Sequence, residues 1–226
     1  MNNDLGIVIV AGGSSTRYGA KPKLLESFSG YPLFIHSLLN FRNSCPDEQI
    51  VIVCHKTLLQ EFKDLTIKFI PNSNFSFTTG GKERYNSVIN GLHIFDNHIK
   101  YVAIHDAARP LAKQELLINC LKSCQDKGSG VAAKKINDTI KLTTDDGNVL
   151  KTIDRTHLWA IETPQVFRLD NLLTAYRKII NDSINVTDDA GAMEYAGFPV
   201  YLVENQNVNI KVTYQADKKF IEVLLG

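Results

Sequence analysis

Short apolar runs alternate with longer stretches of helical spacing along most of the chain. Leu5-Gly-Ile-Val-Ile-Val10 is nearly continuous in its apolar character, as expected of a strand that is buried on both faces. Similar runs occur at Ile50–Cys54, Ile67–Ile70 and Tyr101–Ile104. Helical spacing is found at Pro32–Phe41, Leu58–Leu65, Lys82–Phe95 and Gln114–Cys124. This alternation predicts an α/β fold with a mostly parallel sheet and helices on both faces.

One segment departs from the alternation. Two runs of period two, Thr139–Thr143 and Val149–Ile153, flank the pair Asp146-Gly147. That pair favours a type I′ turn, in which both central residues take positive φ, and so predicts a β-hairpin. A two-stranded ribbon with little apolar surface of its own is marginally stable alone. We expect it to pack on a second subunit or to form an antiparallel edge of the main sheet, and the pattern favours neither.

The chain is expected to form a single domain over residues 1–226. It has 226 residues, 44% of them hydrophobic, which is enough to bury a sizeable core. We find no internal repeat, low-complexity tract or Pro/Gly/Ser-rich linker. The part after the hairpin predicts helices and one strand, at Leu169–Asn181, Asp188–Tyr195, Val200–Val203 (strand) and near Ala216–Leu224.

Charge and apolar content narrow the possible partners. Lys plus Arg number 25 against 24 Asp plus Glu, and a formal net charge of +1 does not attract nucleic acid or a membrane surface. The apolar runs are far shorter than the roughly 20 residues of a membrane helix. The N-terminus lacks a basic leader and a cleavable apolar region, which favours a cytoplasmic protein. The four cysteines contain no CxxC pair and are expected to be reduced and packed.

A glycine-rich loop follows the first predicted strand, where open α/β sheets bind ligands. It reads Ala11-Gly-Gly-Ser-Ser-Thr-Arg17-Tyr-Gly19-Ala-Lys21-Pro-Lys23. Its spacing matches neither the dinucleotide fingerprint GxGxxG nor the Walker phosphate loop. Backbone N–H groups of small residues can approach oxyanions closely, and three cations follow them. The loop could wrap a triphosphate, and the alternative is a tight turn with solvated charges.

Further motifs carry a resemblance to a known family. The loop with Arg17, Gly19 and Pro22-Lys23 is similar to the signature of sugar-phosphate nucleotidyltransferases, which implies a Rossmann-like sheet. Seven later motifs stand in the order found in the 2-C-methyl-D-erythritol 4-phosphate cytidylyltransferase family: Gly80-Gly-Lys-Glu-Arg-Tyr-Asn-Ser87, His105-Asp-Ala-Ala-Arg109-Pro, Asp138-Thr139, Asp154-Arg155, Thr163-Pro-Gln-x-Phe167, Thr187-Asp-Asp and Asn209-Ile-Lys211-Val-Thr213. Asp154-Arg-x-x-Leu-Trp159 favours this family over the related ribitol 5-phosphate cytidylyltransferases. The chain departs from the family at Tyr18, Leu24 and Lys82, where Met, Gln and an acidic residue are common.

The resemblance implies a reaction between two anions. A phosphate oxygen of methylerythritol 4-phosphate would attack the α-phosphorus of CTP and release pyrophosphate, a step of non-mevalonate isoprenoid precursor synthesis. An ionised phosphate needs no general base, so catalysis depends on positioning and charge neutralisation. The catalytic residues implied are Arg17 and Lys23 on the triphosphate, Lys211 near the α-phosphate, and Arg155. The implied contacts of the sugar phosphate are Asp106, Arg109, Thr139, Arg155, Thr163, Thr187 and Lys211.

The nucleotide and metal sites are implied in the same way. The implied nucleotide contacts are Ala11, Gly12, Gly13, Gly81, Arg84, Ser87 and Asp106. A helix N-terminus and the Ser87 hydroxyl can recognise a polar base edge, although capping alone would also explain Ser87. Asp106 could hold the expected cofactor, Mg²⁺ or another divalent cation, or could contact a substrate hydroxyl instead. The family also implies a homodimer in which residues 136–155 form a protruding β-hairpin arm that reaches the partner's site.

Two other classes of protein share part of the pattern. A dinucleotide-dependent oxidoreductase would need GxGxxG, which is absent. A non-catalytic nucleotide-binding protein would keep the sheet and lose the cations, yet the four catalytic cations named above are present. Ribitol 5-phosphate remains the rival substrate within the enzyme class. Trp159 and Phe167 are expected in the core, and His36, His55, His93, His98 and His157 lack metal-ligand spacing.

Overall fold

The computed structural model describes residues 1–13, 18 and 22–226. Within these residues, a seven-stranded sheet has the order β11-β7-β10-β6-β1-β4-β5. Its strands are β1 (Leu5–Ala11), β4 (Ile50–Cys54), β5 (Ser76–Thr79), β6 (Tyr101–Asp106), β7 (Ser129–Lys135), β10 (Trp159–Arg168) and β11 (Leu202–Glu204). β10 runs antiparallel to β6 and β7, and the other pairs are parallel. The predicted α/β fold with a mostly parallel sheet is therefore confirmed.

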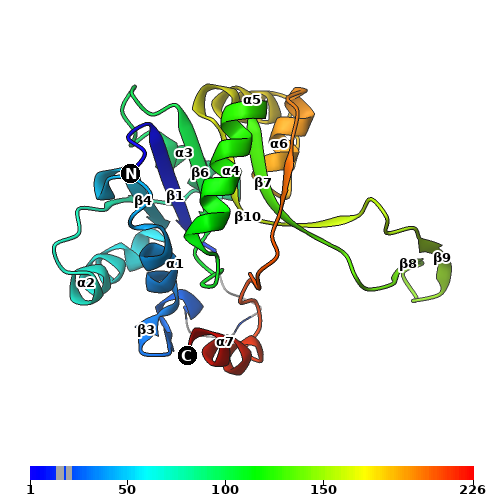
Figure 1. Ribbon diagram of the computed structural model, residues 1–226, viewed down its shortest axis with the longest axis horizontal. Helices are drawn as coiled ribbons and strands as arrows, with labels where there is room; N and C mark the ends of the chain where they lie inside the picture. Colours follow the sequence, from blue (N-terminus) through cyan, green and yellow to red (C-terminus); the bar gives the residue numbers. More distant parts are fainter. Residues whose placement is uncertain (14–17, 19–21) are drawn as a thin grey trace.

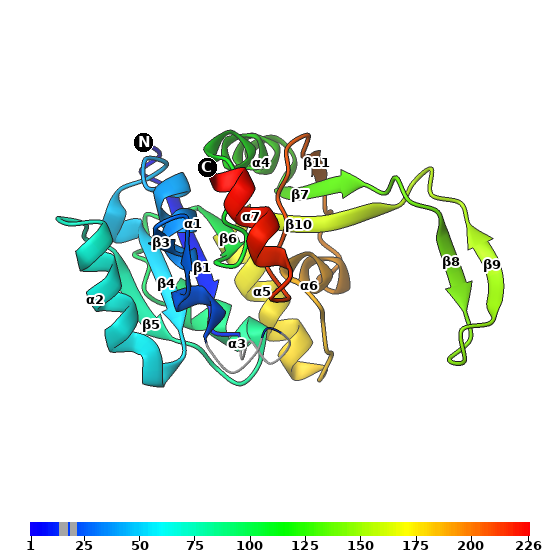
Figure 2. The ribbon, with the colours of Figure 1, turned by 90° about the horizontal axis from the view of Figure 1, so that it is seen from below.

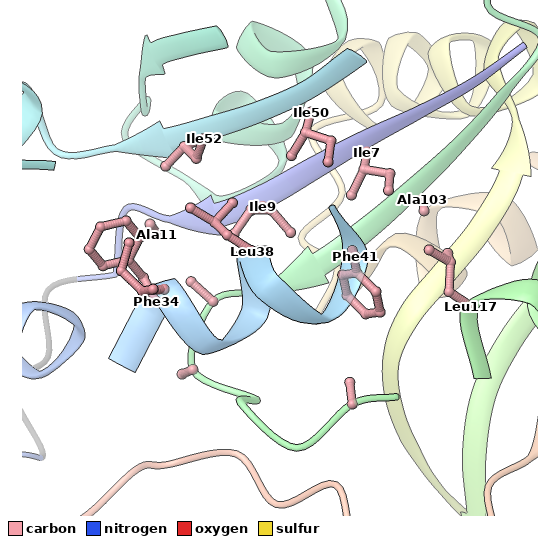
Figure 3. Close-up of a cluster of buried hydrophobic side chains, with 14 of the residues drawn as sticks. Ile7, Ile9, Ala11, Phe34, Leu38, Phe41, Ile50, Ile52, Ala103 and Leu117 are labelled. Carbon is pink, nitrogen blue, oxygen red and sulfur yellow. The ribbon is translucent and has the colours of Figure 1, made fainter. Parts of the chain in front are cut away.

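Helices cover both faces of the sheet (Figure 1). Alternation along β1 directs Ile7 and Ile9 into one apolar layer and Val8 into the other. The first layer contains α1 (Leu33–Phe41), α2 (Leu59–Phe69), α4 (Gln114–Lys127) and α7 (Asp217–Leu225), and the second contains α3 (Arg84–Leu92), α5 (Leu169–Asn181) and α6 (Asp189–Ala196). Figure 3 shows Phe34 and Leu38 of α1 packed over the strands of the first layer. Because helices cover both faces, the carboxyl ends of the parallel strands are the place where a ligand can reach the sheet.

Smaller elements complete the described chain. β2 (Ser27–Phe28) and β3 (Tyr31–Pro32) form a short hairpin before α1, and the 3₁₀ turns are Lys23–Leu25, Asp47–Gln49 and Lys56–Leu58. All four cysteines are free and buried, as predicted. No helix in the described ranges is long and apolar enough to cross a membrane.

The predicted hairpin stands away from the body of the molecule (Figures 1 and 2). β8 (Ile140–Thr143) and β9 (Val149–Ile153) form a separate two-stranded sheet, so the edge-strand alternative is wrong. The type I′ turn is also wrong, because of the pair Asp146-Gly147 the glycine alone takes positive φ, at 85°. Gly147 N donates to the Thr144 carbonyl at 3.0 Å, and the register shifts beside this turn. The connection is a three-residue loop that ends in a left-handed glycine.

One further strand prediction is wrong, and part of the sheet was not predicted. Ile67–Ile70 does not form a strand, because α2 continues to Phe69. Phe62 and Thr66 are buried one helical turn apart, whereas Ile67 is 67% exposed, so the apolar periodicity follows the helix. The strand β10 was not predicted, since Pro164 interrupts its apolar run. Phe167 of β10 lies in the core as expected, but Trp159 is partly exposed.

Candidate active site

A cavity of about 490 Å³ opens at the carboxyl ends of β1 and β6. The turn into α3 forms another wall, and lysines from two loops complete the lining. Carboxyl ends of neighbouring parallel strands meet at one edge of a sheet, which explains why distant motifs converge here. The cavity brings together eight predicted site residues: Gly12, Gly13, Lys23, Gly81, Arg84, Ser87, Asp106 and Lys211. Its lining also includes His55, Lys82 and Glu83, to which the sequence analysis assigned no role.

Asp106, the last residue of β6, lies between two cations. Its Oδ2 accepts a hydrogen bond from Lys211 Nζ at 2.7 Å, and its Oδ1 is 3.4 Å from Arg84 Nη2. Burial by itself would raise the pKa of Asp106. Attraction to Arg84, the larger effect, and to Lys211 outweighs the effect of burial and holds that pKa well below its usual range. The carboxylate is therefore ionised at neutral pH.

A second carboxylate contacts Arg84 from outside the cavity lining. Asp189 lies in the first turn of α6, and its Oδ1 is 2.6 Å from Arg84 Nη1. Burial would lower the pKa of Arg84, but Asp189 and then Asp106 raise it above its usual range. Asp189 belongs to the motif Thr187-Asp-Asp, but its contact could not be predicted from the sequence, because its cationic partner is 105 positions away. An alternating row of charges thus connects α6 to Lys211.

The turn into α3 is held by its own side chains. Ser87 Oγ accepts from Gly81 N at 3.1 Å and donates to the Glu83 carbonyl at 3.4 Å. Asn86 Oδ1 accepts from Glu83 N at 3.1 Å. A Cβ placed on Gly81 would lie 2.4 Å from that of Asn86, so the tight approach requires glycine. The helix cap itself is formed by Glu83 and Asn86, whereas Ser87 ties Gly81 to the first turn and lines the cavity.

The two cavity lysines come from adjoining loops. Lys23 begins a 3₁₀ turn, and its Nζ donates to the carbonyl of Val212 at 2.8 Å. Val212 is fully buried and follows Lys211 directly. The loop after the glycine-rich segment is thereby joined to the segment that carries Lys211. Two positive charges that are 188 positions apart in sequence are consequently held on one side of the cavity.

A bulge in β10 anchors the Lys211 segment. The pairing of β10 with β7 shifts register around Glu162, whose Oε2 accepts from Asn205 Nδ2 at 2.8 Å and from Asn209 Nδ2 at 2.9 Å. Asn209 in turn accepts from Arg109 Nη1 at 2.7 Å through its carbonyl. Glu162 is buried, and these two bonds give its Oε2 partners inside the protein. No role was predicted from the sequence for Glu162, Asn205 or Asn209.

Thr163, predicted to bind the sugar phosphate, contacts the end of β6. Its Oγ1 accepts from Asp106 N at 3.1 Å and lies 3.1 Å from His105 Nδ1. The other nitrogen, His105 Nε2, is 3.2 Å from the Arg109 carbonyl, which can only accept, so Nε2 carries the hydrogen and Nδ1 accepts from Thr163. Burial lowers the pKa of His105 to about 4, although Asp106 opposes that shift. The hydroxyl of Thr163 therefore positions Asp106.

The remaining predicted site residues that the structure describes lie outside the cavity lining. Thr139 and Arg155 are exposed on the arm, where the Arg155 guanidinium donates to the Asn137 carbonyl. Thr187 is exposed just before α6, and Ala11 has its side chain in the core at the end of β1. Arg109 is half-buried against Asn209. Arg17 and Lys21 lie outside the described residues.

Asp106 is the predicted metal ligand, and its chemistry suits Mg²⁺. Within the part of the chain that the structure describes, no group of three or more His, Cys, Asp or Glu side chains could hold a metal. Mg²⁺ nevertheless needs only one or two carboxylates when phosphates and water complete its shell. Both oxygens of Asp106 contact cations, so an ion would compete with Lys211 and Arg84 for this carboxylate. The site fits an ion that arrives with a polyphosphate.

A mostly parallel sheet with cations converging at the carboxyl ends of its strands agrees with the class that the sequence resemblance implies, an α/β nucleotidyltransferase. The family model for 2-C-methyl-D-erythritol 4-phosphate cytidylyltransferase matches residues 5–226. A relative of that name from Bacillus velezensis is 35% identical over 221 residues, which cover 97% of this chain and 94% of the relative. The chain therefore belongs to the 2-C-methyl-D-erythritol 4-phosphate cytidylyltransferase family, and the resemblance found in the sequence is confirmed.

Solved structures agree with this assignment. The 4-diphosphocytidyl-2C-methyl-D-erythritol synthase of Anaerococcus prevotii superposes with a TM-score of 0.84 at 27% identity, covering 99% of this chain and 98% of that one. The 2-C-methyl-D-erythritol 4-phosphate cytidylyltransferase of Francisella tularensis gives a TM-score of 0.80 at 26% identity, covering 98% and 99%. The similarity extends over the whole chain, including the arm.

Proposed function

We propose that this protein joins CTP to 2-C-methyl-D-erythritol 4-phosphate and releases pyrophosphate, a step of non-mevalonate isoprenoid precursor synthesis. The observation that carries the proposal is the cavity in which Lys23, Arg84 and Lys211 converge at the ligand edge of the sheet. Both substrates are anions, so a site that brings them together must supply positive charge. The family match favours methylerythritol phosphate over the ribitol alternative. The retained cations favour an enzyme over a non-catalytic nucleotide-binding protein.

Lys211 is the cation best placed to change partners. Without substrate it pairs with Asp106, and its side chain lines the cavity and is 41% exposed. A triphosphate offers a larger negative charge than one carboxylate, so the ammonium transfers to an oxygen of the α-phosphate. There it neutralises the charge that develops at the five-coordinate phosphorus. Asp106 is then released to hold a hydroxyl of the substrate or a metal ion, while Arg84 remains beside it.

The other site residues bind and orient. Arg17 and Lys23 hold the triphosphate, with backbone N–H groups of Ala11, Gly12 and Gly13 beside it. Gly81, Arg84 and Ser87 contact the nucleotide. The sugar phosphate is held by Arg109, Thr139, Arg155, Thr163 and Thr187. Its attacking oxygen is already ionised, so no side chain has to remove a proton.

Mg²⁺ accompanies the triphosphate in this proposal. Asp106 would hold it together with phosphate oxygens. When bound, the ion neutralises phosphate charge and favours departure of pyrophosphate.

The protein is further proposed to act as a cytoplasmic homodimer of single-domain subunits that exchange arms, residues 136–155. Three apolar side chains of the arm are exposed: Leu142 (46%), Val149 (54%) and Leu150 (57%). A ribbon with unpaired edges and exposed apolar residues is usually covered in native proteins. Arg155 also lies outside the cavity lining of its own chain. In a two-fold dimer, Arg155 and Thr139 would serve the partner's site.

A substrate panel tests the proposed reaction. Pyrophosphate release is measured with each of the common ribonucleoside triphosphates and with either methylerythritol 4-phosphate or ribitol 5-phosphate. We expect CTP with methylerythritol 4-phosphate to exceed every other pair by about a hundredfold in kcat/KM. Equal rates with ribitol 5-phosphate would support the rival substrate. Tight CTP binding without pyrophosphate release from either sugar phosphate would support the non-catalytic alternative.

A further inference from the structure

A buried acid supports the nucleotide cavity from behind. Asp189 is 1% exposed, and its Oδ1 accepts from Arg84 Nη1 at 2.6 Å. The hydroxyl of Tyr176 in α5, itself buried, donates to the same oxygen at 2.5 Å. We propose that Asp189, supported by Tyr176, is a positioning residue that fixes Arg84 for nucleotide binding. This inference rests on the proposed function, because it assigns Arg84 to the CTP site.

Distances show which partner determines the place of Arg84. Its contact with Asp189 is 0.8 Å shorter than its contact with Asp106, 2.6 Å against 3.4 Å. The shorter of two charge-assisted hydrogen bonds is the stronger, so the Arg84 guanidinium is held more by Asp189 than by Asp106. The cost of burying an unpaired carboxylate makes this pairing hard to break. Arg84 is consequently tied to α6 while its other nitrogen faces the cavity acid.

Asp189 is itself held rigidly against the sheet. Gln165 of β10 donates through Nε2 to Asp188 Oδ2 at 2.8 Å and accepts from Ala190 N at 2.9 Å. Asp188 caps the helix by accepting from Gly191 N at 3.0 Å. The helix turn that carries Asp189 is therefore fixed on both sides of that residue. A side chain on a fixed backbone with two converging donors has little freedom to follow Arg84 into the cavity.

The need for such an anchor follows from the exchange proposed for Lys211. Once Lys211 leaves Asp106, the nearest remaining cation to that carboxylate is Arg84 among the contacts described. Without Asp189, the guanidinium would be drawn toward Asp106 and away from the nucleotide. Loss of the anchor should therefore weaken CTP binding more than it slows the chemical step.

The test compares five variants of the full-length protein: two at the anchor, a matched control, Arg84→Gln, and Arg84→Gln combined with D189N. Asp189→Asn removes the charge, and Tyr176→Phe removes only one hydroxyl. We expect the KM for CTP to rise about tenfold in D189N and about threefold in Y176F, with kcat within about threefold of the wild type. Glu194→Gln is the matched control, since it neutralises an exposed carboxylate of the same helix that lies outside the cavity lining. It should leave the thermal stability close to that of the wild type and the KM for CTP within about twofold. In an Arg84→Gln background, D189N should have no further effect on KM.

The outcomes separate this inference from the proposed function. An unchanged KM in both D189N and Y176F, or fully additive effects with Arg84→Gln, would overturn the positioning role. Affinity for CTP is measured by calorimetry in parallel. A wild type that binds CTP without turnover contradicts the proposed function alone, and the positioning role is then decided by the affinities of the variants. A wild type that binds no CTP overturns both.

Discussion

Replacing Lys211 with methionine should remove catalysis and spare the fold. Methionine keeps most of the aliphatic length and deletes the ammonium that lies 2.7 Å from Asp106 Oδ2. Loss of one preorganised cation aimed at developing charge costs about 3–4 kcal/mol in the barrier, or roughly a hundred- to thousandfold in kcat. We therefore expect a fall of that size in pyrophosphate release from CTP and methylerythritol 4-phosphate.

The effect on stability should be much smaller. The Lys211 side chain is 41% exposed, and Asp106 keeps Arg84 at 3.4 Å. A partly exposed ion pair with a remaining partner contributes less than about 1 kcal/mol to the free energy of unfolding. Urea denaturation of K211M should therefore give a midpoint close to that of the wild type.

Lys135→Met supplies the matched control. Lys135 forms an ion pair with Glu204 at 3.2 Å, and both side chains are exposed, at 57% and 44%. It does not line the cavity, so its loss should leave turnover within about twofold. A K211M enzyme that retains turnover within about tenfold of the wild type would refute the reasoning, because no developing charge would then depend on that cation.

Four further predictions concern stability, the metal and assembly. His105 has a pKa of about 4 in the folded protein against an ordinary 6.5, so the unfolded chain takes up its proton at a higher pH. The free energy of unfolding should therefore fall by up to about 3 kcal/mol as the pH drops from about 6.5 to 4. Calorimetric melting of His105→Gln over the same pH range should show a smaller loss. Glu162→Ala leaves two buried amides without their acceptor and should lower unfolding free energy by about 2–4 kcal/mol in urea titrations; a change below about 0.5 kcal/mol would contradict the anchor. Exhaustive chelation should abolish pyrophosphate release and added Mg²⁺ should restore it, whereas full activity after chelation would exclude a metal requirement. Mixing Lys23→Ala with Arg155→Ala subunits should restore activity, since one composite site regains both residues; confirmed subunit exchange without complementation would rule out arm exchange.

The sequence predicts the sheet well where burial is two-sided. β1, β4 and most of β6 are apolar runs of strand length rich in β-branched residues, as expected of strands that are buried on both faces. The prediction fails where tertiary contacts decide whether a segment forms a helix or a strand. Ile67–Ile70 has the composition of a strand, yet the burial of Phe62 and Thr66 continues a helix.

Site residues were likewise predicted where a local motif marks them and missed where only a distant contact does. Asp106 and Lys211 could be predicted because each belongs to a recognisable motif, and the two side chains meet in the cavity. Asp189 and Glu162 were not assigned, since their partners Arg84 and Asn209 are distant in sequence and no local spacing signals a buried contact. The hairpin turn was assigned the wrong type because Asp-Gly is compatible with more than one loop length.

The most direct test of the central claim follows the bond that forms. Methylerythritol 4-phosphate carrying a heavy oxygen isotope in its phosphate is incubated with CTP and the wild-type protein, and the product is examined by phosphorus NMR. Attack of that phosphate on the α-phosphorus predicts a diphosphate whose bridging oxygen carries the label and shifts both phosphorus signals. A product whose bridging oxygen is unlabelled, or pyrophosphate release without a cytidine diphosphate ester, would contradict the account.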